Sequence, residues 1–184
     1  MAEIILITGG SRSGKSAFAQ QLAEQQEGSR LFLATCPVTD KEMEARIQRH
    51  IEDREHTGWD AVEEQIDIAR QFESAKNYRV VLVDCLTLWV NNIMYEAHRR
   101  NTPLDEDKIS QKTTDFLVAA QKHPGTVIFV TNEVGSGIVP GNEDARLYRD
   151  LVGRCNQQVA AASDSAYLVS CGIPIQIKGI GNVF

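Results

Sequence analysis

A phosphate-binding pattern occupies residues 9–16, which read GGSRSGKS and match G-x-x-x-x-G-K-[ST] in full. Glycines in such a loop let backbone N–H groups turn inward around a phosphate. The Lys15 ammonium would then reach the β- and γ-phosphate oxygens, and the Ser16 hydroxyl would ligate Mg²⁺. The residues predicted to bind the phosphates of a nucleotide are therefore Gly9, Gly10, Ser11, Arg12, Ser13, Gly14, Lys15 and Ser16.

A phosphate loop of this kind also needs a carboxylate near the metal ion, at the end of a neighbouring strand. The apolar run Val80–Val83 ends in Asp84, which supplies that group. Ser16 and Asp84 are therefore the predicted Mg²⁺ ligands; the alternative role of Asp84 is to cap the helix that follows. No N-K-x-D motif for reading guanine is present. The D-x-x-G match at Asp150–Gly153 lies within a helical pattern, so a signalling GTPase is disfavoured.

Strand and helix patterns alternate along the chain. Short apolar runs predict strands at Ile4–Thr8, Leu31–Ala34, Val80–Asp84, Thr126–Thr131, Ala166–Ser170 and Ile175–Lys178. Helix-forming segments predict helices at Ser16–Gln26, Thr39–Arg54, Leu88–His98, Asp105–Gln121 and Asp144–Ala162. The phosphate pattern thus follows a strand and opens a helix, which is the context that supports it. The fold class expected is α/β, with a mostly parallel sheet flanked by helices.

The length and the last two strands complete the fold prediction. Only residues 171–174 separate these strands, which is too short for a helical crossover. They are expected to pair as an antiparallel hairpin at the sheet edge. The 184 residues suit a single domain, 1–184, with one buried core.

Charge and composition exclude several classes of protein. The 19 Lys and Arg against 25 Asp and Glu give a net charge of −6, which argues against binding nucleic acid. No apolar stretch reaches the length of a membrane span, and the N-terminus lacks a secretory pattern. Four cysteines without C-x-x-C spacing are expected to be reduced core residues, which suits a cytoplasmic protein.

Four further stretches are more specific than a phosphate loop requires: DKEMEARIQRH at 40–50, DCLTLWVNN at 84–92, TNEVGSGIVP at 131–140 and RDLVGRCNQ at 149–157. With these motifs the chain closely resembles the bifunctional adenosylcobinamide kinase / adenosylcobinamide-phosphate guanylyltransferase family of cobalamin biosynthesis. The resemblance implies a P-loop NTPase of RecA-like fold and a homotrimer. It also implies phosphorylation of adenosylcobinamide with ATP or GTP, followed by transfer of GMP from GTP to adenosylcobinamide phosphate with release of pyrophosphate.

The same resemblance implies roles for particular residues. His50 would be the catalytic nucleophile that carries GMP, beside the catalytic cation Lys15. Further nucleotide contacts are implied for Thr35, Cys36, Pro37, Ile51, Glu52, Asp53, Arg54, Glu63 and Asp84. The chain departs from the family at Ser11, where alanine is frequent, and at Asp84, where some relatives have glutamate.

Several residues have an ordinary structural interpretation beside the functional one. A lone histidine on a charged helix is usually a solvated surface residue, but His50 has Arg46 and Arg54 one turn away. The other histidines, His56, His98 and His123, are expected at the surface. Trp59 and Trp89 are expected to fill the core rather than stack on a ligand.

Alternative roles stay open for three residues at the predicted site, and two alternative functions stay open for the whole protein. Glu133 would orient the attacking hydroxyl, lie near the metal or only cap its loop, and Arg146 and Arg149 would bind phosphates, line a subunit boundary or face solvent. The competing functions are a small P-loop kinase for another metabolite and a non-enzymatic RecA-type nucleotide switch.

Overall fold

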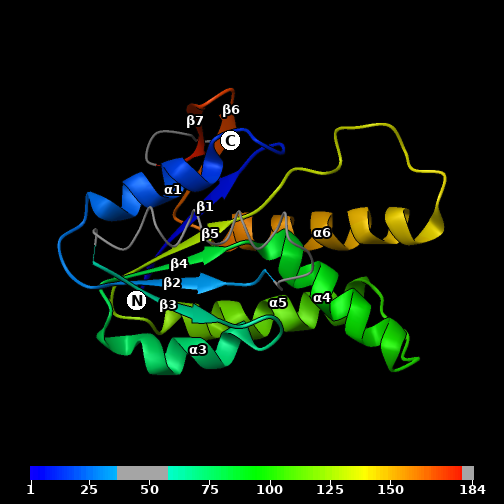
Figure 1. Ribbon diagram of the computed structural model, residues 1–184, viewed down its shortest axis with the longest axis horizontal. Coiled ribbons are helices and arrows are strands. Elements are labelled where there is room, and N and C mark those ends of the chain that lie inside the picture. The colour runs from blue at the N-terminus through cyan, green and yellow to red at the C-terminus, as the bar shows by residue number, and fades with distance from the viewer. Residues whose placement is uncertain (37–57, 180–184) are drawn as a thin grey trace.

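The computed structural model describes residues 1–36 and 58–179. Within them a seven-stranded sheet has the order β3-β2-β4-β5-β1-β6-β7 (Figure 1). Its strands are β1 Glu3–Thr8, β2 Arg30–Ala34, β3 Trp59–Glu63, β4 Val80–Asp84, β5 Thr126–Val130, β6 Ser165–Ser170 and β7 Ile173–Lys178. All neighbouring strands pair in parallel except β6 and β7, which are antiparallel. The predicted fold class and the C-terminal edge hairpin are confirmed.

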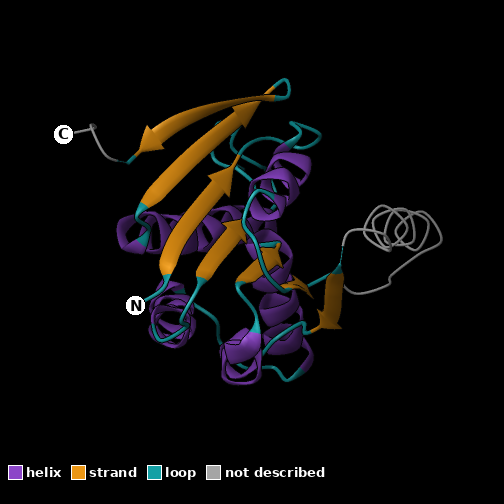
Figure 2. Ribbon diagram, turned by 90° about the vertical axis from the view of Figure 1, so that its left-hand side faces the viewer, coloured by secondary structure: helices purple, strands orange, loops and turns teal. Residues whose placement is uncertain are grey.

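Helices cover both faces of the sheet, as Figures 1 and 2 show. The helices are α1 Lys15–Glu24, α3 Ile68–Ser74, α4 Leu86–Arg99, α5 Glu106–Gln121 and α6 Glu143–Ala162, with a 3₁₀ turn η1 at Ala75–Asn77. Alternate residues of a strand face opposite sides. In β1, Ile5 and Ile7 pack in the cluster that includes α1, while Ile4 and Leu6 pack in the cluster built with α3 to α6.

Polar side chains fix where the long helices begin. The Asp105 carboxylate accepts a hydrogen bond from the Lys108 N–H at 2.9 Å, and Asn142 Oδ1 accepts from Asp144 N–H at 2.8 Å. Both residues satisfy backbone donors that the first turn of a helix leaves unpaired. Acidic residues in the first turns of α5 and α6 add a favourable interaction with the helix dipole.

The sequence patterns missed strand β3 and helix α3. Strand β3 has the sequence WDAVE, and its residues are exposed or half-buried because it lies at the sheet edge. Its alternation is therefore weak, and only hydrogen bonding to β2 defines it. The predicted helix Thr39–Arg54 lies outside the described residues.

The hairpin turn differs from the prediction in its length and in the exposure of its cysteine. β7 begins at Ile173, so the turn is only Cys171–Gly172, and an edge strand can accept Pro174. Cys171 is consequently exposed rather than in the core, whereas Cys85 and Cys155 are buried.

His123 is 1% exposed, in contrast to the surface position predicted. Its Nε2 lies 3.2 Å from the Ala75 carbonyl, and its Nδ1 accepts a hydrogen bond from Gly125 N–H at 3.1 Å. The ring thus ties the α5–β5 turn to η1, a contact that no local pattern reveals. His98 is exposed, as expected.

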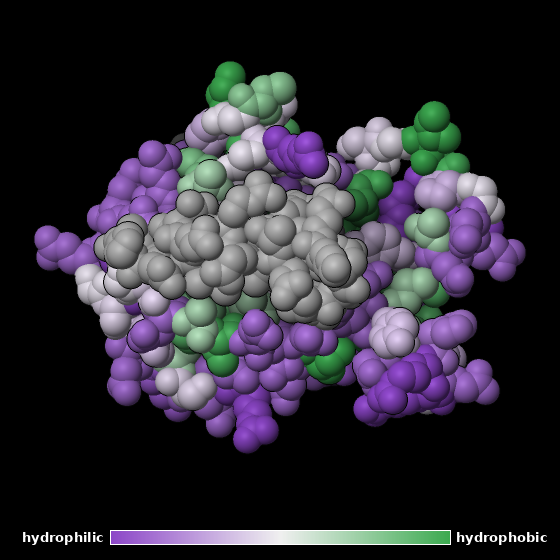
Figure 3. All heavy atoms as spheres, in the orientation of Figure 1, coloured by the Kyte–Doolittle hydropathy of each residue, from purple (hydrophilic) through white to green (hydrophobic). Residues whose placement is uncertain are grey.

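Apolar side chains gather at two places on the surface in Figure 3, over the β6–β7 hairpin and over the loop that joins β5 to α6. The exposed residues there are Ile173, Ile175 and Ile177 in β7, and Ile138 and Val139 in the loop. No helix in the described part of the chain is long and apolar enough to cross a membrane.

Candidate nucleotide-binding site

The predicted phosphate loop connects β1 to α1. Gly14 is the N-cap of α1 with a φ of 93°, and Lys15 begins the helix. The Lys15 side chain is 8% exposed and its Nζ donates to the Gly10 carbonyl at 3.0 Å, across the loop. The loop therefore combines a helix N-terminus with a cation held directly beside it, an arrangement that favours anions.

The β6–β7 hairpin supports this loop from one side. Gly172 N–H donates to the Ser13 carbonyl at 2.8 Å. A Cβ on Gly9, whose φ is 156°, would lie 2.3 Å from the Val169 carbonyl oxygen, and one on Gly14 would lie 3.2 Å from Gly172 Cα. The glycines are thus needed for close packing against the hairpin, a role that the motif alone does not show.

The carboxyl ends of the parallel strands bring the other predicted residues to the same edge. β5 lies between β1 and β4, and the register places Ala34, Glu63 and Asp84 side by side across β2, β3 and β4. Just beyond β5, Glu133 N–H donates to the Gly9 carbonyl at 3.1 Å. The phosphate loop, Asp84 and Glu63 therefore share the edge at which open α/β sheets bind ligands.

Thr35 holds the end of β4 rather than pointing outward. Its hydroxyl accepts from Cys85 N–H at 2.8 Å and donates to the Cys85 carbonyl at 2.7 Å, and the residue is fully buried. Its own N–H donates to the Asp84 carbonyl at 3.2 Å. Thr35 thus fixes the backbone beside Asp84, and Cys36, which follows it, is half-buried.

Lys15 and Asp84 both act on the buried thiol of Cys85. Burial raises the pKa of Cys85 to about 11; the charge of Asp84 raises it further and that of Lys15 lowers it. The thiol is therefore protonated at neutral pH. Both charges therefore act on this thiol.

The residues present fit Mg²⁺. Ser16 is half-buried in the first turn of α1 and Asp84 is half-buried at the end of β4. A hydroxyl and a carboxylate are hard oxygen donors, and Mg²⁺ is commonly held by one or two protein groups together with water and substrate phosphates. No group of three His, Cys, Asp or Glu that could hold a metal by itself occurs among the described residues.

Some of the remaining predicted residues belong to the described part of the chain and others do not. Glu133 is exposed and its Oε1 accepts from Gly135 N–H at 2.5 Å, so it caps its own loop. Arg146 Nη1 donates to the Pro140 and Gly141 carbonyls at 3.0 and 2.7 Å, anchoring the loop end, and Arg149 lies 3.9 Å from Asp150. Outside the described residues lie His50, Pro37, Ile51, Glu52, Asp53 and Arg54.

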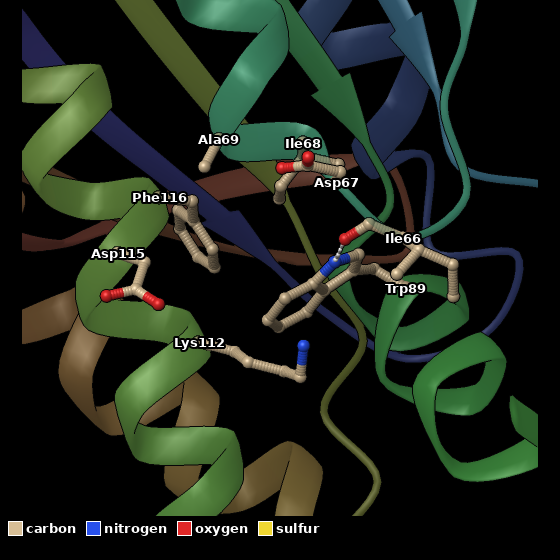
Figure 4. A pocket seen from close by; sticks show the side chains of 8 residues that line it. All are labelled: Ile66, Asp67, Ile68, Ala69, Trp89, Lys112, Asp115 and Phe116. Carbon is tan, nitrogen blue, oxygen red and sulfur yellow. Dashed lines mark hydrogen bonds between the residues drawn. The ribbon is translucent and has the colours of Figure 1, made fainter. Parts of the chain in front are cut away.

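A small hollow in the helical layer lies apart from this edge. Figure 4 shows its lining residues, Ile66, Asp67, Ile68, Ala69, Trp89, Lys112, Asp115 and Phe116, none of which belongs to the phosphate loop. Trp89 Nε1 donates to the Ile66 carbonyl at 2.8 Å, and the ring packs edge-on to Phe116 at 5.1 Å. Trp89 fills the core, as predicted.

Gly9→Ala should unfold the phosphate loop. The new methyl group would clash with the Val169 carbonyl, which is backbone and cannot move alone. We expect a loss of about 2 kcal/mol or more in the free energy of unfolding, measured by denaturant titration, together with loss of nucleotide binding. Gly10→Ala is the stability control, because nothing lies within 4 Å of its Cβ position. Equal stability of the two variants would contradict the packing role of Gly9.

Comparison with known proteins agrees with this geometry. Among solved structures, an ATPase from the type III secretion system of pathogenic bacteria superimposes with a TM-score of 0.62 at 13% identity, over 95% of this chain and 56% of the other, which shows a shared fold alone. The bifunctional adenosylcobalamin biosynthesis protein CobU of Escherichia coli (strain K12) is 39% identical, and CobU of Salmonella typhimurium is 38% identical. Each alignment covers 95% of this chain and 99% of the relative.

A third relative, the bifunctional adenosylcobalamin biosynthesis protein CobP of Pseudomonas aeruginosa, is 34% identical over 95% of this chain and 96% of its own. The family model described as cobinamide kinase / cobinamide phosphate guanyltransferase matches residues 5–177. The match includes the phosphate loop, Asp84 and the supporting hairpin. The chain belongs to the cobinamide kinase / cobinamide phosphate guanyltransferase family.

Proposed function

We propose that this protein phosphorylates adenosylcobinamide with ATP or GTP and then transfers GMP from GTP to adenosylcobinamide phosphate. The observation that carries the proposal is the family match over residues 5–177. The phosphate loop beside Asp84 supports it, because both reactions act on a nucleoside triphosphate. A kinase for another metabolite and a non-enzymatic switch are not favoured, since the relatives are named as bifunctional biosynthetic proteins.

Lys15 would supply the main cation for the phosphates. In the structure its ammonium contacts the neutral Gly10 carbonyl. A phosphate oxygen attracts the ammonium more strongly than this neutral carbonyl does, because it carries a negative charge. The side chain would therefore leave Gly10 for the phosphate. Mg²⁺, held by Ser16 and Asp84, would neutralise charge on the phosphates.

His50 is proposed as the residue that carries GMP between GTP and the substrate. A neutral imidazole is a competent nucleophile near pH 7, since its ordinary pKa is about 6.5. Attack of its nitrogen on the α-phosphorus would release pyrophosphate, and the corrinoid phosphate would then take the guanylyl group. Nucleotide contacts are proposed for Thr35, Cys36, Pro37, Ile51, Glu52, Asp53, Arg54 and Glu63.

Lys15→Ala should abolish both reactions without unfolding the protein. Loss of a preorganised cation at the phosphates typically lowers a rate by about 10²-fold or more. The measurement is incubation with α- or γ-labelled GTP, with and without adenosylcobinamide, beside circular dichroism of the variant. Near-normal label transfer by Lys15→Ala would rule out the phosphate-loop assignment.

His50→Ala should separate the two reactions. The variant is expected to lose guanylylation of both protein and substrate while phosphorylation of adenosylcobinamide persists, because the imidazole takes part only in the GMP transfer. The wild-type adduct should be an acid-labile, alkali-stable phosphoramidate that retains α-label. His98→Ala, at an exposed histidine, is the control. Label on the His50→Ala protein, or none on the wild type, would contradict the mechanism.

We also propose a cytoplasmic, single-domain protein that assembles as a homotrimer. The exposed isoleucines of β7 leave an apolar strip that a monomer would expose to water. Light scattering at micromolar concentration should give three times the chain mass of 20.4 kDa. A monomer throughout that range would refute the trimer.

A further inference from the structure

Asn132 occupies a position between the phosphate loop and Asp84. It is the second residue after β5, which pairs with β1 on one side and β4 on the other. The next residue, Glu133, donates its N–H to the Gly9 carbonyl at 3.1 Å. The residues that follow β5 therefore lie between the phosphate loop and the end of β4, where Asp84 stands.

Polar groups of two helices hold Asn132, α4 through its side-chain amide and α6 through its backbone carbonyl. Its Nδ2 donates to Thr87 Oγ1 at 3.1 Å, and its backbone carbonyl accepts from Asn156 Nδ2 at 3.1 Å. Thr87, in α4, is 1% exposed; its hydroxyl also lies 2.9 Å from Cys85 Sγ. Its carbonyl accepts from Tyr148 Oη of α6 at 3.1 Å. These contacts hold the Asn132 backbone and direct its Nδ2 toward Thr87.

The side-chain oxygen of Asn132 has no hydrogen-bond partner among the described residues. Asn132 Oδ1 is buried and accepts no hydrogen bond within the described part of the chain. A buried acceptor without a donor destabilises the folded state, and such groups in native proteins usually have a reason. Thr8 Oγ1 and Ser13 Oγ, at the same edge of the sheet, are buried and unpartnered in the same way.

The chemistry of Oδ1 restricts what could pair with it. An amide oxygen only accepts hydrogen bonds, and ionised phosphate oxygens have no proton to donate. At a phosphoryl-transfer site the Lys15 ammonium and the backbone N–H groups of the loop donate to phosphate oxygens, so the donors left for Oδ1 are the attacking hydroxyl and water. Glu133, the neighbouring carboxylate, is exposed and already accepts from Gly135 N–H. Of these two residues, Asn132 therefore has the oxygen that is better placed to accept a hydrogen bond from an attacking hydroxyl.

We propose that Asn132 is a catalytic residue of the kinase step, whose Oδ1 accepts a hydrogen bond from the substrate hydroxyl, and that Thr87 is its positioning residue. This rests on the proposed function. The hydroxyl oxygen forms a bond to the γ-phosphorus while the bond to the β,γ-bridging oxygen breaks, and the nucleoside diphosphate leaves with that electron pair. The hydroxyl proton passes to water, because an amide oxygen is too weak a base to keep it. Asn132 thus orients the nucleophile without accepting its proton.

The test measures phosphorylation of adenosylcobinamide, nucleotide affinity and thermal stability in matched variants. Asn132→Ala should lower kcat about 10²-fold and Thr87→Val about tenfold, since misplacement of a reacting group has effects of this size. Nucleotide Kd should stay within about twofold in both. Thr87→Ser, which keeps the hydroxyl, should restore kcat. Thr113→Val removes the hydroxyl of a buried threonine in α5 and should leave kcat unchanged.

A double variant tests whether Thr87 acts through Asn132. Thr87→Val should have no further effect on kcat in the Asn132→Ala protein, because the positioned group is gone. If Asn132→Ala does not fold, the comparison of Thr87→Val with Thr87→Ser decides.

Provided that the wild-type protein is active, the proposal is overturned if the Asn132→Ala variant keeps the wild-type kcat. It is also overturned if Thr87→Val and Thr87→Ser are equally impaired. A wild-type protein that does not phosphorylate adenosylcobinamide would instead overturn the proposed function, and this inference with it.

Discussion

Parallel hydrogen bonding of β5 to both β1 and β4 is the constraint on which the site depends. It aligns three carboxyl ends at one edge, so that the phosphate loop, the residues after β5 and Asp84 follow one another across the sheet. Main-chain bonds continue this alignment beyond the strands, from Thr131 N–H to the Ile7 carbonyl at 2.9 Å and from Glu133 N–H to the Gly9 carbonyl. Main-chain bonds that extend the sheet therefore place the first residues of the loop after β5.

Polar contacts then hold the edge in one arrangement. Thr35 binds both backbone groups of Cys85, and Thr87 contacts the thiol of Cys85 and the amide of Asn132. Buried polar groups that are paired in this way fix one geometry, because breaking any contact leaves a buried group unsatisfied. A site built on such contacts can be preorganised before substrate arrives, which is what transition-state stabilisation requires.

The edge hairpin has a second role besides closing the sheet. Its turn binds the Ser13 carbonyl through Gly172, and the backbone at Val169 leaves room for no side chain at Gly9. The same hairpin carries the exposed isoleucines of β7. Only a few residues of the hairpin would therefore separate a partner bound to β7 from the phosphate loop.

The sequence by itself determined the elements that depend mainly on residues close together in the chain. Buried strands such as Val80–Asp84 and Thr126–Val130 are continuous apolar runs, and the glycines, lysine and serine of residues 9–16 mark a loop whose chemistry depends on backbone and charge. Helices α5 and α6 begin within one residue of the predicted positions and end where predicted. The motifs also indicated the family, because their order extends along nearly the whole chain.

Tertiary structure decided what depends on contacts between distant residues. Strand β3 exists because β2 supplies its hydrogen bonds, and His123 is buried because η1 covers it. The positions of Thr87 and Asn132, 45 residues apart, follow from the strand order and could not be obtained from spacing. Burial and hydrogen bonding depend on distance in space, and the sequence specifies that distance only through the complete fold.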